Sequence, residues 1–130
     1  MGDPEPEGVS AAMIDDAERR LGQRFPDDYR EFLRSQNGLE TWFGDILVRL
    51  YSIEQVVELN EIHDHLSDQP ELIHIGSNGS VAIAFDFRKH PPAVILVDLV
   101  SIHWSDAFYQ AESFDQFMEQ RRRGEEYRWG

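Results

Sequence analysis

Residues 14–38 carry the sequence IDDAERRLGQRFPDDYREFLRSQNG, whose pattern predicts two consecutive helices. Its first part has apolar residues at helical spacing: Ile14, Ala17 and Leu21. Residues three or four positions apart lie on the same helix face, so this spacing predicts an amphipathic helix. Ser10 has the hydroxyl that an N-terminal cap needs, and the predicted helix therefore covers residues 10–21.

The second part of the stretch predicts another helix, which starts at Phe25-Pro26-Asp27-Asp28. Proline suits a first helical position, and the two acids lie where the helix dipole favours negative charge. Tyr29, Phe32 and Leu33 form its apolar stripe. Asn37-Gly38 ends the helix, because both residues tolerate the left-handed backbone conformation that closes a helix.

Strand and helix patterns follow one another in the rest of the chain. Alternating apolar residues predict strands, Ser-x-x-Gln capping boxes predict helix starts, and a continuous apolar run predicts a strand buried on both faces. These patterns predict two short strands within residues 39–51, a helix from Ser52 to about Leu66, strands at 72–75 and 81–87, a buried strand at 93–100, a short strand within 101–109 and a helix after Ser113. Arg121-Arg122-Arg123 closes the last helix with cations at the negative end of its dipole.

This order of elements predicts an α+β fold, because strands and helices do not alternate as regularly as in a doubly wound parallel sheet. We expect a single domain, since 130 residues suffice for one core. The domain covers residues 10–123 and consists of an antiparallel or mixed twisted β-sheet flanked by about four helices. Residues 1–9 are expected to form a flexible acidic tail, and residues 124–130 a C-terminal tail.

The chain resembles the SUKH superfamily, which includes the domain of a fungal regulator of cell-wall synthesis and many bacterial immunity proteins. In that superfamily a first helix ends in a Leu-Gly-like step, and a second helix carries a proline, an aromatic residue and a Phe-Leu pair before Asn-Gly. Later pieces fit the same order, so the resemblance spans about residues 12–120. The SUKH-like motif residues are Leu21, Gly22, Pro26, Tyr29, Phe32, Leu33, Asn37, Gly38, Gly76, Gly79, Phe114 and Phe117.

The resemblance implies an α+β fold and, for bacterial members, a role as an immunity protein that binds and blocks a cognate toxin, commonly a nuclease or deaminase. It implies structural rather than catalytic roles for the motif residues, so we assign no catalytic residue and expect no enzymatic activity. The alternative that it leaves open is a cytoplasmic regulatory or scaffold module of the same fold with no toxin partner.

Composition narrows the class of partner. The chain has 25 acids and 12 bases, which gives a formal net charge of −13. Nucleic acids and anionic membranes are bound through basic surfaces, so neither is an expected partner. A cognate toxin or another basic protein is expected instead. The chain has no cysteine, which excludes disulfides and thiol catalysis. We expect no cofactor, a cytoplasmic location, and a monomer or weak dimer.

The predicted middle helix has the densest acids of the chain: Glu54, Glu58, Glu61, Asp64 and Asp68. Their spacings of four, three, three and four place neighbours on adjoining parts of one helix side. Each like-charge pair costs about 0.2–0.5 kcal/mol, and no base within the segment relieves the repulsion. One interpretation is a docking face for a basic protein, towards which charge steers association. The other is a solvated helix face, the usual role of a charge run.

The opposite side of the same helix is expected to be buried through its apolar residues: Val56, Leu59, Ile62 and Leu66. Two tryptophans receive different assignments. Trp104, with Asp106 beside it, is a further candidate for the partner-binding face, because polar residues surround it and aromatics often anchor interfaces. Trp42 is expected to lie in the core.

The cluster His63-Asp64-His65 is the one part of the sequence that suggests a metal site. Glu61 and His65 are four positions apart and can face one ion, and Asp68 can approach them. Two good ligands do not make a site, and the sequence identifies no group that would orient them. We therefore expect no metal.

Overall fold

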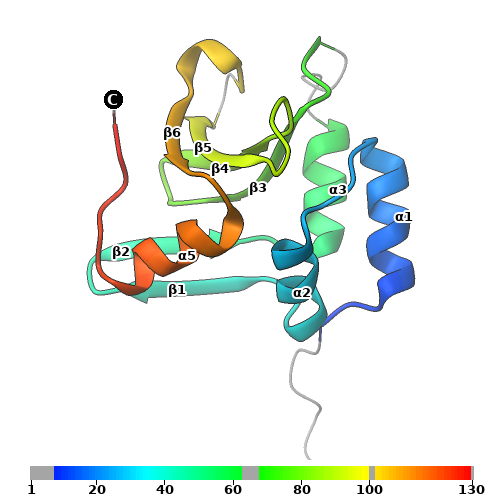
Figure 1. The fold of residues 1–130 in the computed structure, drawn as a ribbon, viewed down its shortest axis with the longest axis horizontal. Helices are drawn as coiled ribbons and strands as arrows, with labels where there is room; N and C mark the ends of the chain where they lie inside the picture. The colour runs from blue at the N-terminus through cyan, green and yellow to red at the C-terminus, as the bar shows by residue number, and fades with distance from the viewer. Residues whose placement is uncertain (1–7, 63–67, 100–101, 130) are drawn as a thin grey trace, which may run out of the picture.

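The computed structural model describes residues 8–62, 68–99 and 102–129 (Figure 1). Within these ranges the chain forms a curled, six-stranded antiparallel sheet with helices packed against it, which confirms the predicted α+β class. The strands are β1 (Leu39–Phe43), β2 (Ile46–Leu50), β3 (Leu72–Ser77), β4 (Val81–Asp86), β5 (Ala93–Asp98) and β6 (Phe108–Ala111). The helices are α1 (Ala11–Leu21), α2 (Asp27–Ser35), α3 (Ile53–Ile62), the short 3₁₀ helix η1 (Trp104–Asp106) and α5 (Phe114–Arg122).

The strands lie in chain order, β1 to β6, and each pairs antiparallel with the next. The joint between β2 and β3 is the shortest, with two residue pairs, Arg49↔Ser77 and Leu50↔Gly76. The register of β3 against β4 shifts between His74 and Gly76. Gly76 of β3 lets β2 approach closely, since a Cβ atom on Gly76 would lie 2.3 Å from the carbonyl oxygen of Arg49 on β2.

The first helix starts as predicted, because the Ser10 side chain accepts a hydrogen bond from the N–H of Met13 at 3.2 Å. Its three apolar residues, Ile14, Ala17 and Leu21, are buried. The packed chain begins slightly earlier than residue 10, since Val9 is buried and donates its N–H to the carbonyl oxygen of Leu33. The second helix begins one residue after Pro26, which adopts an extended conformation just outside it.

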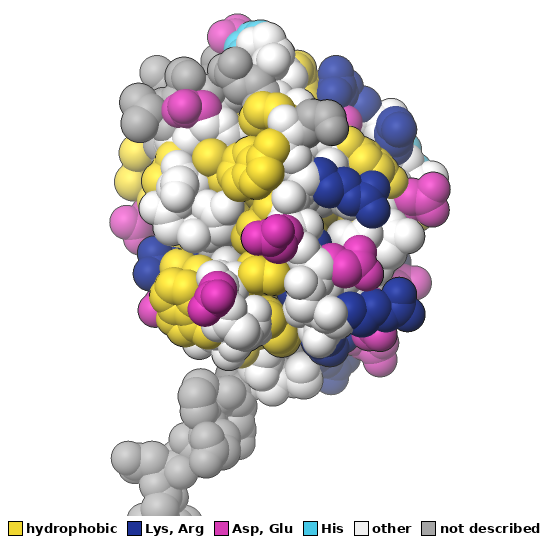
Figure 2. All heavy atoms as spheres, turned by 90° about the vertical axis from the view of Figure 1, so that its left-hand side faces the viewer, with side chains coloured by type: hydrophobic (Ala, Val, Ile, Leu, Met, Phe, Trp, Pro, Cys, Tyr) yellow, Lys and Arg dark blue, Asp and Glu magenta, His cyan; other side chains and the backbone are white. Residues whose placement is uncertain are grey.

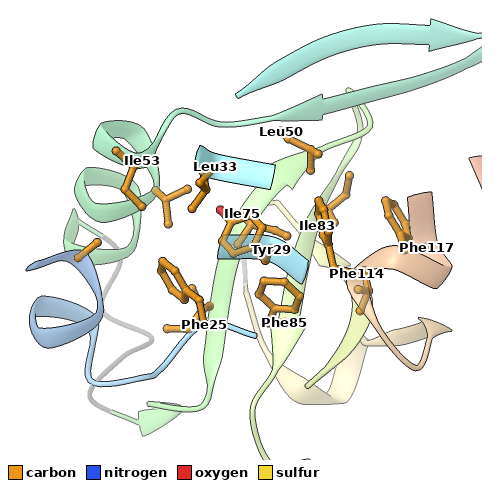
Figure 3. Close-up of a cluster of buried hydrophobic side chains, with 14 of the residues drawn as sticks. Phe25, Tyr29, Leu33, Leu50, Ile53, Ile75, Ile83, Phe85, Phe114 and Phe117 are labelled. Atoms are coloured by element: carbon orange, nitrogen blue, oxygen red, sulfur yellow. The ribbon is translucent and has the colours of Figure 1, made fainter. Parts of the chain in front are cut away.

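Tyr29 of α2 lies at the centre of the main core, between the helices and one face of the sheet (Figure 3). Its ring meets Phe25, Phe85 and Phe114 edge-on, with centroid distances of 5.1, 5.1 and 5.2 Å. Such edge-to-face contacts add to the stability that burial of the rings provides. Tyr29 therefore joins α2, the sheet and α5 in one cluster.

The hydroxyl of Tyr29 is buried and has no hydrogen-bond partner within the described part of the chain. Removing an unsatisfied buried hydroxyl avoids its desolvation penalty. We expect Tyr29→Phe to raise the free energy of unfolding at pH 7 by about 1 kcal/mol, measured by urea denaturation. Tyr109→Phe, with a ring that is 43% exposed, should change it by less than about 0.5 kcal/mol.

The same substitution should alter the alkaline limb of stability. Burial raises the pKa of Tyr29 well above its ordinary value. Above about pH 10 the unfolded chain loses this proton while the folded chain keeps it, so the stability of the parent falls as pH rises. Tyr29→Phe should remove that part of the fall. A Tyr29→Phe protein that is less stable at pH 7 would contradict the first expectation and indicate a partner for the hydroxyl in solution, and an unchanged alkaline limb would contradict the second.

A smaller cluster of apolar residues covers the other face of the sheet: Leu72, Ala82, Ala84, Ile95, Val97 and Ile102. Trp104 packs against it. Trp42 does not pack against this cluster. The prediction that Trp42 lies in the core is wrong, since this residue is 63% exposed. β1 lies at the edge of the sheet, and alternate residues of an edge strand can point to solvent.

Residues 125–129 pack beside β6 and the β1–β2 hairpin. The Gln110 side chain donates to the carbonyl oxygen of Arg128 at 2.7 Å and accepts from its N–H at 2.9 Å. The hydroxyl of Tyr127 donates to the carbonyl oxygen of Leu47 at 2.7 Å. Trp129 contacts Phe108 edge-on. These contacts hold the end of the described chain against the sheet.

Arg121 does not have the dipole-neutralising role predicted for it. It is 1% exposed, and its guanidinium lies over the rings of Phe117 and Tyr127, at 5.0 and 4.5 Å. Burial lowers the pKa of Arg121 below its ordinary value. Arg122 and Arg123 are exposed and pair with Glu119. One arginine of the three therefore belongs to the packed interior.

Candidate partner-binding site

The start of the acidic helix α3 is held by Asn37, which lies beyond the end of α2. The Asn37 Oδ1 atom accepts from the N–H of Ile53 at 2.7 Å, and its Nδ2 atom donates to Glu54 Oε1 at 2.8 Å. Ser52 and Gln55 form the predicted capping box, with two hydrogen bonds of 3.2 Å. Together these bonds satisfy N–H groups that the first helical turn leaves free. Asn37 thus links the segment after α2 to the start of α3.

This arrangement also fixes a negative charge. The Asn37 hydrogen bond, with smaller contributions from the backbone N–H of Glu54 and from Ser52, lowers the pKa of the Glu54 carboxyl below its ordinary value. Glu54 therefore stays ionised even in mildly acidic solution. An acid at the first turn of a helix is also favoured by the helix dipole.

Asn60 fixes the rotation of α3 against the sheet. It is fully buried, and its Nδ2 atom donates to the carbonyl oxygens of Val56 and His74, both at 2.7 Å. Its Oδ1 atom accepts from the N–H of His74 at 2.9 Å. This rotation buries Val57 and leaves Ile62 65% exposed. The expectation that Ile62 is buried is therefore wrong.

An open groove with a volume of about 710 Å³ runs between α1 and α3. Figure 1 shows the two helices side by side at one end of the molecule. Ala17, Ile53 and Val57 are buried and form an apolar floor. Met13 and Ile62, 42% and 65% exposed, add apolar surface on opposite helices. The remaining lining residues are Ala12, Asp16, Arg20, Glu54, Glu58 and Glu61.

Acids outnumber bases in this groove by four to one. Glu61 accepts two hydrogen bonds from the Arg20 guanidinium, at 2.6 and 3.2 Å, so α1 supplies the base that the α3 segment lacks. Asp16 pairs with Arg19 at 3.2 Å. Glu58 is exposed and has no ion-pair partner in the described ranges. Exposed pairs of this kind contribute about 1 kcal/mol or less, so a partner can exchange them readily.

The predicted site residues are distributed as follows. Glu54, Glu58 and Glu61 lie together along the groove. Asp68 is exposed beyond the end of α3, and Asp64 lies outside the described residues. Within those residues, sequence reasoning missed the contribution of α1, whose Met13, Asp16 and Arg20 are exposed polar-face positions with no motif of their own.

Trp104 lies apart from the groove lining. It is half-buried in η1, where the Arg88 guanidinium stacks over its ring at 3.7 Å. Its backbone N–H donates to the Gln69 side chain at 2.8 Å. Asp106 ends the same 3₁₀ helix. Trp104 and Asp106 thus belong to the segment that covers the second apolar cluster.

The described residues contain no group of three His, Asp or Glu side chains arranged to hold a metal ion. His63 and His65, which the sequence singled out, lie outside those residues. The groove offers carboxylates and apolar side chains, and this combination suits cationic and apolar side chains of another protein. None of the helices in the described ranges is long and apolar enough to span a membrane.

Residues 8–120 match the SMI1 / KNR4 family (SUKH-1). The chain belongs to this family. The SUKH resemblance seen in the sequence is thereby confirmed. A curated relative, the uncharacterized protein YnaB of Bacillus subtilis (strain 168), is 43% identical over 56 residues. The aligned stretch covers 43% of this SUKH chain and only 37% of YnaB.

Several of the SUKH-like motif residues lie in the interior or at close backbone contacts. Tyr29, Leu33, Phe114 and Phe117 are buried in the main core. Gly38 has a φ of 100°, and a Cβ atom there would lie 3.0 Å from the Leu50 carbonyl oxygen. The residues that line the groove include none of the motif residues. The groove floor is nevertheless shared with the main core, since Ala17, Ile53 and Val57 belong to both, and the motif residue Asn37 binds Glu54 of the groove.

Proposed function

We propose that this SUKH protein is an immunity protein, which acts in the cytoplasm and neutralises a cognate toxin by stoichiometric binding rather than by catalysis. The α1–α3 groove is the proposed docking site for a basic surface of the toxin. The observation that carries the proposal is the combination of an apolar floor with four acids and one base in a single open groove. Membership of the SUKH-1 family supports it.

The chemistry of the groove explains how such binding would work. Covering exposed apolar side chains such as Met13 and Ile62 removes them from water, which makes the free energy of binding more favourable. Glu58 supplies a charge that a lysine or arginine can meet. Nuclease toxins carry basic surfaces for their substrates, because phosphate backbones require them. An acidic protein that covers such a surface blocks access of the nucleic acid.

The first test is capture of the toxin by this protein from cells that also carry the neighbouring genes, at low and at high salt. We expect a basic toxin from a neighbouring gene in a 1:1 complex that weakens as salt rises, because salt screens exposed charges. Co-expression with this protein should abolish the toxicity. Capture of a constitutive cellular protein, with no protection against any neighbouring gene product, would favour the regulatory module instead.

Charge reversal in the groove tests the site itself. Glu58→Lys should weaken the captured complex at least about tenfold, which corresponds to 1.4 kcal/mol, because it places a base against a basic partner. Ile62→Glu should weaken it by removing apolar contact. Glu112→Lys is the matched control, since Glu112 is also exposed but lies next to β6. Equal binding by all three variants would refute the groove as the docking site.

A further inference from the structure

The free edge of the sheet at β1 is the second surface with the properties of an interface. Among the described residues β1 pairs with β2 alone. The hairpin turn has two residues, Gly44 and Asp45, and the register starts with Phe43↔Ile46. In such hairpins the pair next to the turn is hydrogen-bonded, and hydrogen-bonded and non-bonded pairs alternate after it. The backbone groups of Glu40 and Trp42 therefore point outwards to the open edge.

The side chains along this edge are unusually apolar for an exposed surface. Trp42 is 63% exposed and stands opposite Leu47. On the helix side of the strand, Leu39, Thr41 and Phe43 line a hollow of about 660 Å³ with residues of α2 and α5. Figure 2 shows the end of the molecule that carries the hairpin turn, where hydrophobic side chains lie exposed among charged ones. An unprotected edge strand of this kind readily pairs with another strand.

The charges of strands β1 and β2 balance, in a strongly acidic chain. Glu40 is the one charged residue of β1, and it forms an ion pair with Arg49 on β2 at 3.0 Å. Two copies with a net charge of −13 repel each other over most of their surfaces. A neutral, apolar edge is where that repulsion is weakest. The occupant that this favours is a second copy of the chain.

We propose that two copies pair through β1 in an antiparallel, two-fold arrangement centred on Thr41, which joins their sheets into one. This register places Glu40 opposite Trp42 of the second copy and Leu39 opposite its Phe43. It uses the outward backbone groups of both Glu40 and Trp42 in each copy, which gives four hydrogen bonds. It also keeps the two Glu40 side chains apart, whereas a register centred on Glu40 would place them opposite each other.

The helices beside β1 offer one pair of opposite charges under the same two-fold rotation, in a hollow that Asp28 and Asp115 also line. Figure 1 shows α2 beside the start of β1 and α5 reaching towards its end. Rotation about Thr41 exchanges the two ends of the strand, so α2 of one copy faces α5 of the other. Glu31 of α2 and Arg122 of α5 are both exposed and line the same hollow. Glu31 of one copy is thereby directed towards Arg122 of the second copy.

Sedimentation equilibrium of the full chain tests this dimer. Strand-edge interfaces are small, and small interfaces bind weakly, so the concentration series should extend to about 0.5 mM. We expect the average mass to rise towards twice that of the chain as concentration increases. Trp42→Glu should raise the dimer dissociation constant at least about tenfold, because it places two glutamates opposite each other at each end of the seam. A mass that stays monomeric throughout the series would overturn the proposal.

Two variants already named, Ile62→Glu and Trp42→Glu, separate this surface from the groove. Ile62→Glu, at a similarly exposed position, should leave the dimer unchanged while it weakens capture of the toxin; Trp42→Glu should do the reverse. The dimer and the proposed function can therefore fail independently.

Arg122→Glu should weaken the dimer, and Glu31→Arg in the same chain should restore it. Failure of this charge exchange to restore dimerisation would exclude the proposed register.

Discussion

Gly76→Ala is expected to lower the free energy of unfolding by about 3 kcal/mol or more. The added methyl group would lie 2.3 Å from the carbonyl oxygen of Arg49, a distance at which the strands must separate. That oxygen belongs to the backbone, so no side-chain rotation relieves the clash. The β2–β3 joint consists of two residue pairs, and Gly76 is in one of them. Urea denaturation followed by circular dichroism measures the loss.

Gly44→Ala is the matched comparison for this prediction. Gly44 has a φ of 65° and no atom within 4 Å of the position that a Cβ would take. Its replacement should therefore cost only the backbone strain of the left-handed conformation, about 1–2 kcal/mol. A Gly76→Ala protein no less stable than Gly44→Ala would show that β2 and β3 can separate at a cost of no more than about 1–2 kcal/mol. In that case the short joint would be a flexible hinge of the sheet.

Asn60→Ala is expected to cost about 3–4 kcal/mol, because it removes three buried hydrogen bonds and leaves the N–H and carbonyl groups of His74 without this partner. Native domains are stable by only about 5–15 kcal/mol, so this is a large fraction of the total. Thermal and urea unfolding both measure it. The effect should extend to the groove, since Asn60 sets the rotation of α3.

Glu58→Ala provides the control on the same helix. Glu58 is exposed and has no ion-pair partner in the described chain, so its replacement should change stability by less than about 0.5 kcal/mol. If Asn60→Ala proved equally mild, water would have to replace the lost amide in the interior. Toxin capture by the folded fraction of Asn60→Ala would then still report whether the helix had rotated.

Serine caps predicted the starts of α1 and α3 correctly, whereas α2 begins one residue later than its proline implied. Ser10 and Ser52 accept the hydrogen bonds that their capping signals imply, because such bonds join residues three positions apart. The paired strands around Gly44 and Gly79 followed from turn chemistry in the same way. The order of the predicted strands and helices indicated the α+β class, and the family resemblance implied the same arrangement.

Contacts between distant segments were not predictable from the sequence. Arg20 of α1 and Glu61 of α3 form an ion pair although they are 41 positions apart in the sequence. Asn37 accepts a hydrogen bond from Ile53 of α3, which is 16 positions further along the chain. Arg121 looked like one of three equivalent surface arginines, since nothing in its neighbourhood indicates that Tyr127 covers it. Asn60 was hidden because a polar residue at a buried helix position gives no periodic signal. The acids of the candidate site were found, but the half of the groove on α1 was not.

Every strand pairs with its neighbour in the chain, which affects how the protein is made. Most of these pairings close short connections at little entropic cost, and the β2–β3 pairing closes over α3, so the sheet can extend strand by strand during synthesis. The aromatic core closes later. Asp28 accepts a hydrogen bond from the N–H of Asp115, 87 positions further on, and Tyr29 packs against Phe114. On the ribosome the first helices must therefore wait for α5, and until it emerges their aromatic cluster stays open to chaperones and to other chains.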